Sequence, residues 1–328
     1  HVLLDLQTLF PVWGCTLLSL GNALPFRPDT AQQVVIDEAG QCHPAYAISA
    51  LLRGSRCLLI GDEHQLEPVI NLDRSEEERM LRRLGRPEID PVYRTTSVDA
   101  NSAIRLGART WASIPTLRDH FRCHHDIITV SDRLCSYGLQ THTELTPAMH
   151  PLLAEAVVGY DIRGRQSAYL GSWKNDTEVG VVCDLVRTLI SSGISPGRIA
   201  VLTPYRGQLR ALDDGLRRAG VPLYDVTGPD ARGDGQAMLF EIPTECVVTG
   251  TVHRFQGGER EIVLFSSVVS ESRSLPFLNQ RANLLNVAVS RAKRHFVLLG
   301  SKDVLRQGEL TSVLVQSVKH WVAQNHSF

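Results

Sequence analysis

The sequence predicts an α/β protein with parallel sheets, because short apolar runs alternate with stretches of helical periodicity. Residues 34–39 (VVIDEA) and 57–62 (CLLIGD) are apolar runs that end on carboxylates, and Pro44 to Arg53 between them has near-helical apolar spacing. Continuous apolar runs of this length are typical of strands buried on both faces. Four later runs continue the alternation: RIAVLTP (198–204), ECVVTGTV (245–252), EIVLFSSVV (261–269) and RHFVLLGS (294–301). Repeated strand, helix, strand order predicts parallel pairing.

The chain length of 328 residues favours two domains. Ser75 to Pro115 is rich in Arg and Glu, so we expect helices and loops there and a domain boundary near Ile114 and Pro115. The expected domains are therefore residues 1–115 and 116–328. Later segments are expected to form helices at Gly207 to Ala219, Asn279 to Ala292 and Leu310 to Val322, and a loop at Thr227 to Gln236.

The composition excludes a globally basic protein, because 34 basic and 35 acidic residues leave a net charge of -1. Any nucleic-acid contact should therefore come from local clusters of cations. Seven cysteines form no CxxC pair, which predicts free thiols in a cytoplasmic, or otherwise intracellular, compartment. No apolar run approaches the roughly 18 residues of a membrane span. Residue 1 is His and no signal segment is present, so we expect the chain to begin inside a longer protein.

The polar residues after the strand-like runs are the first candidates for chemistry, since ligands of parallel sheets bind outside the carboxyl ends of strands. We expect the tails DEA, GDEHQ, TPY and TVHRFQG all to lie at such ends. We expect Asp37 to hold Mg²⁺ and Glu38 to orient and deprotonate a water that attacks a triphosphate. A surface turn is the alternative for an isolated Asp-Glu pair. Gln65 could sense a γ-phosphate through its amide, and we expect Asp62 to shape the same loop and to be one of the nucleotide-binding residues.

Several segments resemble the motifs of superfamily 1 helicases, in the branch that includes the nonsense-mediated-decay RNA helicase. They follow one another along the chain in the same order as in that family. IDEAG and GDEHQLEPV resemble motifs II and III, while LRDHFRCHHDI and VLTPYRGQ resemble the QYRMHP and TPYxxQ elements. TVHRFQGGEREIVLFS resembles motif V, and LLNVAVSRAKRHFVLLG resembles motif VI. The resemblance covers about residues 15–300. It corresponds to the C-terminal two thirds of the family's core.

This resemblance implies two RecA-like domains in tandem, the first one N-terminally incomplete, with ATP hydrolysed between them. Arg122 and Arg291 would then act as arginine fingers on charge that develops at the γ-phosphate. Phe121 stands where the family usually has Tyr, and its ring would stack on adenine. Gly258 and Glu259 would contact the nucleotide, Glu259 at the ribose. The preceding Gln256 and Gly257 would form a tight turn, whereas His253 is explained equally well by packing.

For nucleic acid, the resemblance implies contacts through Thr16 in the first domain and Thr203, Pro204 and Thr251 in the second. Hydroxyls and backbone amides at strand ends suit contacts to phosphates that do not depend on base sequence. The partner would be single-stranded DNA or RNA, and a polarity of 5′ to 3′ is implied.

One departure from the family pattern is large, because the sequence contains no GxxGxGK[ST] phosphate-binding motif. We therefore expect this chain alone to be inactive as an ATPase, with an additional N-terminal segment supplying the motif. Truncation and true loss of the motif both remain open. The alternatives to an ATP-dependent helicase or translocase are a non-catalytic nucleic-acid-binding relic and an ATP-dependent clamp. A smaller departure is Glu67 in QLEP, which would lie near the γ-phosphate.

Overall fold

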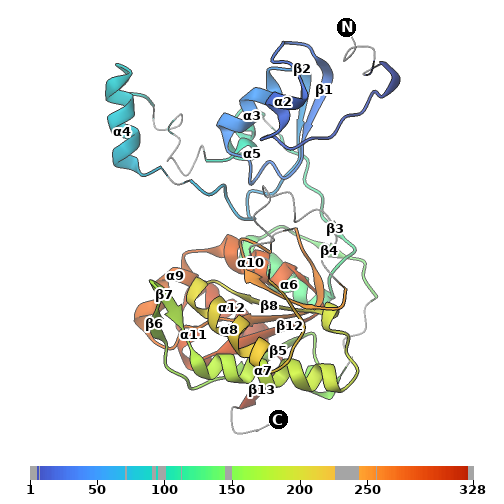
Figure 1. The fold of residues 1–328 in the computed structure, drawn as a ribbon, viewed down its shortest axis with the longest axis vertical. Coiled ribbons are helices and arrows are strands. Elements are labelled where there is room, and N and C mark those ends of the chain that lie inside the picture. Colours follow the sequence, from blue (N-terminus) through green and yellow to red (C-terminus); the bar gives the residue numbers. More distant parts are fainter. Residues whose placement is uncertain are drawn as a thin grey trace. The chain divides into compact units, whose positions relative to one another are not determined.

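The computed structural model describes residues 6, 8–70, 72–90, 94, 101–111, 113–144, 150–225, 244–255 and 257–323. The chain divides into two compact units, His1–Pro115 (unit 1) and Thr116–Phe328 (unit 2) (Figure 1). The loop expected at Thr227 to Gln236 lies outside the described residues, as does Gln256. Among the described helices, none combines the length and the apolar character that crossing a membrane would require.

Unit 1 contains the predicted strand, helix, strand element. Strands β1 (Ala31–Ile36) and β2 (Gly54–Leu59) pair in parallel, with Val34 opposite Cys57 and Ile36 opposite Leu59. The connecting helix α3 (Pro44–Leu51) begins after His43, whose imidazole accepts the Ala45 N–H as a cap. The other described helices of unit 1 are α2 (Leu20–Ala23), α4 (Arg74–Arg83) and α5 (Ala103–Ala108). The parallel α/β prediction for this segment is confirmed.

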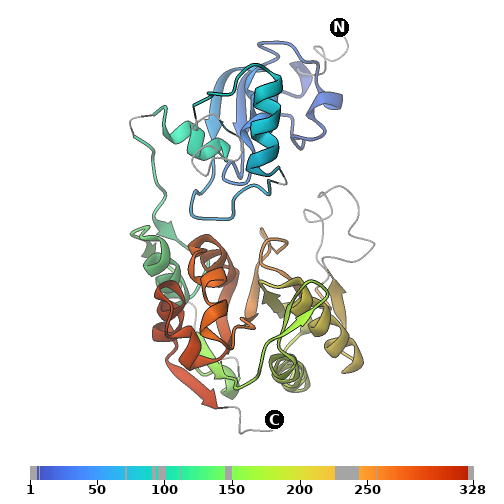
Figure 2. The ribbon, with the colours of Figure 1, turned by 90° about the vertical axis from the view of Figure 1, so that its left-hand side faces the viewer.

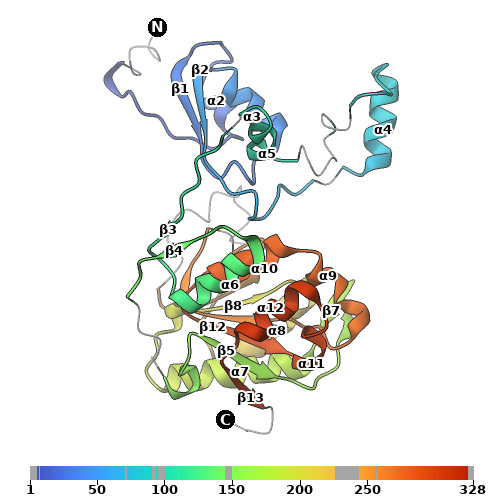
Figure 3. The same cartoon turned by 180° about the vertical axis from the view of Figure 1, so that it is seen from behind.

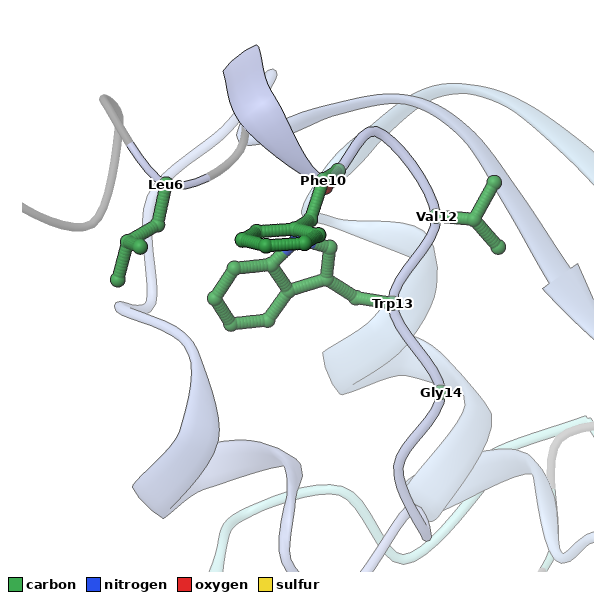
Figure 4. A pocket seen from close by; sticks show the side chains of 5 residues that line it. All are labelled: Leu6, Phe10, Val12, Trp13 and Gly14. Carbon is green, nitrogen blue, oxygen red and sulfur yellow. The ribbon is translucent and has the colours of Figure 1, made fainter.

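The described part of the unit 1 sheet has two strands and leaves apolar side chains in contact with solvent. Val35, Leu58 and Ile60 are 53%, 46% and 44% exposed. Near the N-terminus an open hollow is lined by Leu6, Phe10, Val12, Trp13 and Gly14, and Phe10 lies over the Trp13 indole (Figure 4). In a parallel sheet such side chains are normally covered on both faces. The apolar composition of β1 and β2 is therefore typical of strands in the interior of a larger sheet.

Unit 2 is built on a seven-stranded sheet with the order β13-β5-β12-β11-β8-β10-β9, and every described pairing in it is parallel. The strands are β5 (Val157–Asp161), β8 (Ile199–Thr203), β9 (Leu223–Asp225), β10 (Val247–Thr251), β11 (Arg260–Ser266), β12 (Ala292–Gly300) and β13 (His320–Ala323). Two short pairs lie outside this sheet: β3 (Asp119–His120) with β4 (Gln140–Thr141), and β6 (Ser167–Tyr169) with β7 (Ser172–Lys174).

Helices cover both faces of the large sheet (Figures 2 and 3). Helices α7 (Asp176–Ser191) and α8 (Arg206–Arg218) pack on one face, against alternate strand residues such as Ile199, Val201 and Leu264. Helices α6 (His125–Cys135), α10 (Ala282–Ser290) and α12 (Glu309–Ser317) pack together on the other face. The short helices α9 (Pro276–Asn279) and α11 (Lys302–Leu305) complete this unit. Alternation of strand residues between two helical layers explains why the central strands read as unbroken apolar runs.

Two expectations about the C-terminal part are wrong in detail. The helix expected at Leu310 to Val322 ends at Ser317, and residues His320–Ala323 form the edge strand β13 beside β5. Pairing with β5 overrides the amphipathic pattern of this segment, because the pattern carries no information about a distant partner. The helix expected at Asn279 to Ala292 is observed as α10, which begins three residues later and ends two residues earlier, while α9 shares only Asn279 with the expected segment.

A buried polar network ties the ends of α7, α8 and β11 together. Glu178 is fully buried and accepts hydrogen bonds from Ser266 Oγ (2.6 Å) and the Val268 N–H (2.9 Å). Gln208 donates to Ser266 Oγ (2.8 Å) and accepts from the Asn175 N–H (2.7 Å). Burial raises the pKa of Glu178 from 4.5 to about 7, although the hydrogen bonds that its carboxylate accepts from Ser266 and Val268 oppose the change. Desolvation of the charged carboxylate thus outweighs its hydrogen bonds.

The raised pKa of Glu178 predicts that unit 2 loses stability as the pH rises from about 4.5 to about 7. Over this interval the folded state binds the proton that the unfolded state has lost, so deprotonation favours unfolding. Urea unfolding across that interval should show the decline, and Glu178→Gln should remove the part due to this residue. Exposed Glu309→Gln is the control. An unchanged pH slope in Glu178→Gln would contradict the assignment.

Candidate active site

The polar loops that follow β1 and β2 meet because the two strands are parallel neighbours. The Ile60 N–H donates to the Ile36 carbonyl (2.9 Å), and the Ala39 N–H donates to the Ile60 carbonyl (2.8 Å). These backbone bonds continue the ladder past the ends of the strands. The segment carrying Asp37 and Glu38 is thereby fixed against the segment carrying Asp62 and Gln65.

Two glycines permit this close approach. A Cβ added at Gly40 would lie 2.4 Å from the Asp62 carbonyl oxygen, and one at Gly61 would lie 2.7 Å from the Gly40 nitrogen. Both obstacles are backbone atoms, which cannot rotate away as a flexible side chain does. Gly40, the fourth residue of DEAG, therefore has a steric reason in this chain.

The carboxylates of Asp37 and Glu38 are exposed at the end of β1. Asp37 Oδ1 accepts the Glu38 N–H (2.9 Å), and Gln41 Nε2 donates to Glu38 Oε2 (2.9 Å). Glu38 has φ +52°, a left-handed conformation that is unfavourable for a residue with a side chain. Sequence reasoning missed Gln41, which follows DEAG directly and orients the expected base.

The loop after β2 is also held by local hydrogen bonds. Asp62 Oδ1 accepts the His64 N–H (2.8 Å), and the Gln65 N–H donates to the Asp62 carbonyl (3.4 Å). Glu67 forms an ion pair with Arg105 of α5 (2.8 Å), which also donates to the Glu63 carbonyl (3.3 Å). Glu67 thus has a cationic partner in unit 1. Arg105 was missed because it lies 38 residues further along the chain than Glu67.

In unit 2, the candidate nucleotide residues gather where β11 and β12 begin. Glu259 directly precedes β11, and Arg291 directly precedes β12. The expected carboxyl-end position of TVHRFQG (251–257) is observed for its first residue, Thr251. Thr251 ends β10 at the carboxyl edge, but the chain must return to the amino edge before the parallel strand β11 can start. Gly258 and Glu259 therefore lie near the amino ends of the strands, whereas Thr251 lies at the carboxyl end of β10.

Glu259 is the centre of a cationic cluster at this amino edge. Its Oε2 lies 3.5 Å from Arg122 Nη1, and its Oε1 pairs with Lys293 Nζ. Arg122 also donates to the Ser290 carbonyl (3.2 Å), while its side chain remains 41% exposed. Two cations around one half-exposed carboxylate leave net positive charge, which suits a polyanionic ligand. Lys293 was missed, although it is two residues beyond Arg291.

Arg291 is much more buried than Arg122, at 3% exposed. Its guanidinium donates to the carbonyls of Val287 (3.2 Å) and Gly258 (3.3 Å) and to Ser290 Oγ (3.2 Å). These bonds tie the end of α10 to the turn before β11. Of the two predicted arginine fingers, Arg122 is the one with a solvent-accessible side chain.

Phe121 is 72% exposed, and the ring of His142 stacks on it with centroids 4.9 Å apart. His142 was not predicted as part of the site. It lies 21 residues beyond Phe121 and reaches it through the pairing of β3 with β4.

The residues predicted to contact nucleic acid differ in accessibility. Thr203 is fully buried, and its hydroxyl accepts the Tyr205 N–H (3.4 Å), so this side chain supports the loop after β8. Pro204 and Thr251 are partly exposed at the carboxyl edge of unit 2. In unit 1, Thr16 Oγ1 is 2.8 Å from Ser19 Oγ and accepts the Ser19 N–H (3.2 Å), which organises the turn before α2.

Cations cluster beside Pro204 and Thr251. Arg206 and Arg281 are exposed, and Arg281 stacks over Phe277 (4.6 Å to the ring centroid), whose ring packs against Tyr205 (4.9 Å). Partial desolvation, followed by the charges of Arg281 and Arg206, lowers the pKa of His253. Within the described part of the chain, neither guanidinium has a carboxylate within 4.0 Å. This is the local basic cluster that the composition led us to expect.

The donor set of unit 1 fits Mg²⁺ held together with a ligand. The described residues contain no group of three or more His, Cys, Asp or Glu side chains arranged for a metal ion. Mg²⁺ commonly uses only one or two carboxylates and completes its shell with phosphates and water. The exposed Asp37 carboxylate, with Asp62 on the adjoining loop, has this character.

Comparison with known protein families supports the same reading of the motifs. A family profile described as an AAA domain matches residues 104–303, which is more than half of the chain. This chain belongs to the AAA-domain family. A second profile with the same description matches residues 11–72.

The relatives confirm the resemblance to superfamily 1 helicases. The mouse (Mus musculus) DNA replication ATP-dependent helicase/nuclease DNA2 is 26% identical over 92% of this chain. The Regulator of nonsense transcripts 1 homolog of Arabidopsis thaliana is 27% identical over 88%, and Helicase sen1 of Schizosaccharomyces pombe is 26% identical over 86%. The matched regions make up 28%, 21% and 15% of these relatives, so the chain spans less than a third of their length.

We predict that Gly61→Ala separates the two unit 1 loops and destabilises unit 1 by about 1 to 3 kcal/mol, because overpacking against backbone forces the chain to move. Chemical unfolding of the chain measures the loss. Gly21→Ala is the matched control, since a Cβ there would meet no atom within 4 Å. Equal stability of the two variants would show that the loops do not require this close approach.

Proposed function

We propose that this chain is the distal part of an ATP-dependent helicase or translocase that acts on single-stranded nucleic acid. The observation that carries the proposal is the backbone contact between the loops after β1 and β2, which fixes Asp37 and Glu38 beside Asp62 and Gln65. Four polar side chains on adjoining strand ends suit a hydrolytic nucleotide site. Relatives described as ATP-dependent helicases support the same activity.

In this proposal unit 1 binds the metal ion and activates the attacking water. Asp37, with Asp62 nearby, would hold Mg²⁺, which neutralises phosphate charge when it is bound. Glu38 accepts a proton from the attacking water, and the hydrogen bond from Gln41 orients the carboxylate for that step. Gln65 donates its amide to the γ-phosphate.

Unit 2 would supply positive charge and contacts to the nucleoside. Arg122 stabilises the charge that develops on the γ-phosphoryl group, and its accessibility suits this role. Arg291 fixes the turn that carries Gly258 and Glu259, and we propose that it also contributes charge to the transition state. Glu259 contacts the ribose and holds Arg122 and Lys293 in place. Phe121 stacks on the base.

The carboxyl edge of unit 2 is the proposed nucleic-acid surface. Pro204 and Thr251 offer backbone and hydroxyl contacts, and Arg206, His253 and Arg281 offer charge. Thr203 supports this surface from beneath, and Thr16 is the proposed contact in unit 1. Contacts of these kinds bind phosphates and sugars and do not depend on the base sequence.

A phosphate-binding loop must come from residues outside this sequence if the complete protein hydrolyses ATP. We propose an N-terminal segment whose strand and helix cover the exposed Val35, Leu58 and Ile60. The greater length of the relatives is consistent with such a segment. All seven cysteines are free, which supports an intracellular, cytoplasmic setting.

Arg122→Ala in the complete protein should lower kcat for ATP by about 10³-fold or more and change KM little, because an arginine finger acts on transition-state charge. Steady-state ATPase kinetics measure both constants. Arg118→Ala, four residues earlier and also exposed, is the matched control. A raised KM with unchanged kcat would assign Arg122 to ground-state binding and contradict the proposed role.

Arg206→Ala should weaken binding of single strands to a similar extent for every base sequence, and should reduce the slope of log affinity against log salt by about 1. Fluorescence anisotropy with labelled homopolymers across ionic strength measures this slope. Arg187→Ala on the exposed side of α7 is the control. Binding that is insensitive to salt, or a sharp base preference in the parent protein, would favour a dedicated recognition module.

A further inference from the structure

Two rings that directly follow the paired strands β3 and β4 form a stacked pair at the surface of unit 2. The centroids of Phe121 and His142 are 4.9 Å apart and their planes are inclined by 19°. His142 Nε2 lies 2.7 Å from Asp119 Oδ1, so the imidazole is fixed at its far nitrogen. Phe121 nevertheless remains 72% exposed. His142 therefore covers one face of the Phe121 ring, while most of the Phe121 side chain stays accessible to solvent.

The backbone holds the two segments in register. The Gln140 N–H donates to the Arg118 carbonyl (2.8 Å), and the His142 N–H donates to the His120 carbonyl (2.8 Å). Thr143 Oγ1 then donates to the Cys123 carbonyl (2.6 Å). His142 is thus placed against Phe121 by bonds on both sides of it, independently of the stacking itself.

Stability of the fold does not account for this arrangement. Both side chains of the His142–Asp119 contact are exposed, at 44% and 63%, and contacts between exposed charged or polar groups contribute little to stability. A stacked pair at the surface also leaves much of the apolar Phe121 ring in water. Because the Phe121–His142 pair contributes little to the stability of the fold, we look for its role in a ligand that contacts the exposed face of the Phe121 ring.

We infer that His142, fixed by Asp119, is a positioning residue that holds the Phe121 ring in the orientation for stacking on the base of the bound nucleotide. The inference rests on the proposed function, in which Arg122, the next residue, meets the γ-phosphate. Phe121 has no hydroxyl to orient it by a hydrogen bond, so the ring behind it performs that task. The contact to the base is made by the ring face alone.

The test compares binding of ATP with binding of inorganic tripolyphosphate by the complete protein. His142→Ala should raise the Kd for ATP by about 2- to 10-fold, the range expected when the stacking of the base on Phe121 is lost. The Kd for tripolyphosphate should stay unchanged, because that ligand has no base. His142→Phe keeps the stack without the bond to Asp119 and should restore most of the affinity for ATP.

A fluorescent base gives an independent readout. Stacking on Phe121 should quench 2-aminopurine riboside triphosphate, and His142→Ala should reduce this quenching. His320→Ala, an exposed histidine on β13, is the control.

The outcomes separate this inference from the proposed function. ATP binding and quenching that are unchanged in His142→Ala would overturn the inference while leaving the proposed function intact. Equal weakening of ATP and tripolyphosphate would also overturn it, because the effect would then come through Arg122. Failure of the parent protein to bind any of the three ligands would overturn the proposed function itself.

Discussion

Parallel strand pairing is the constraint on which the chemistry of both units depends. In unit 1 it brings the loops after β1 and β2 into backbone contact, because neighbouring parallel strands end at the same edge. In unit 2 each connection between parallel strands must run from the carboxyl end of one strand to the amino end of the next. A single connection can therefore place residues at both ends of the strands. The stretch from Thr251 to Glu259 connects β10 and β11 in this way. Candidate nucleic-acid contacts and candidate nucleotide contacts therefore lie at opposite edges of one sheet.

The charge of the two units is complementary in kind. Unit 1 presents exposed carboxylates at Asp37 and Glu38, whereas unit 2 presents Arg122 and Lys293 around Glu259. A metal ion and a water molecule need the first set, and phosphoryl charge needs the second. Neither set alone contains the groups that nucleotide hydrolysis requires, which is why the proposal assigns catalysis to the complete protein.

The sequence predicted the central strands well because burial on both faces produces unbroken apolar runs, as in residues 199–203 and 260–266. It could not predict the edge strand β13, whose amphipathic pattern also fits a helix and whose identity depends on β5. The same limit applies to the site. Glu38 and Arg122 were found from motifs, but Gln41, Arg105, Lys293 and His142 act through contacts that only the folded chain brings together. Burial of Arg291 and Thr203 was likewise hidden, since a motif does not report how deeply a side chain lies.

We propose that the candidate nucleotide residues of unit 1 and those of unit 2 both respond to one nucleotide with its metal in the complete protein. Hydrogen–deuterium exchange of the complete protein, with and without Mg²⁺ and a non-hydrolysable ATP analogue, tests it most directly. The account predicts slower exchange in residues 37–41 and 61–65 of unit 1 and in residues 119–123 and 257–259 of unit 2. Exchange in the core strands β8 and β11 should change little. Protection confined to one unit, at concentrations where the analogue is bound, would contradict the account.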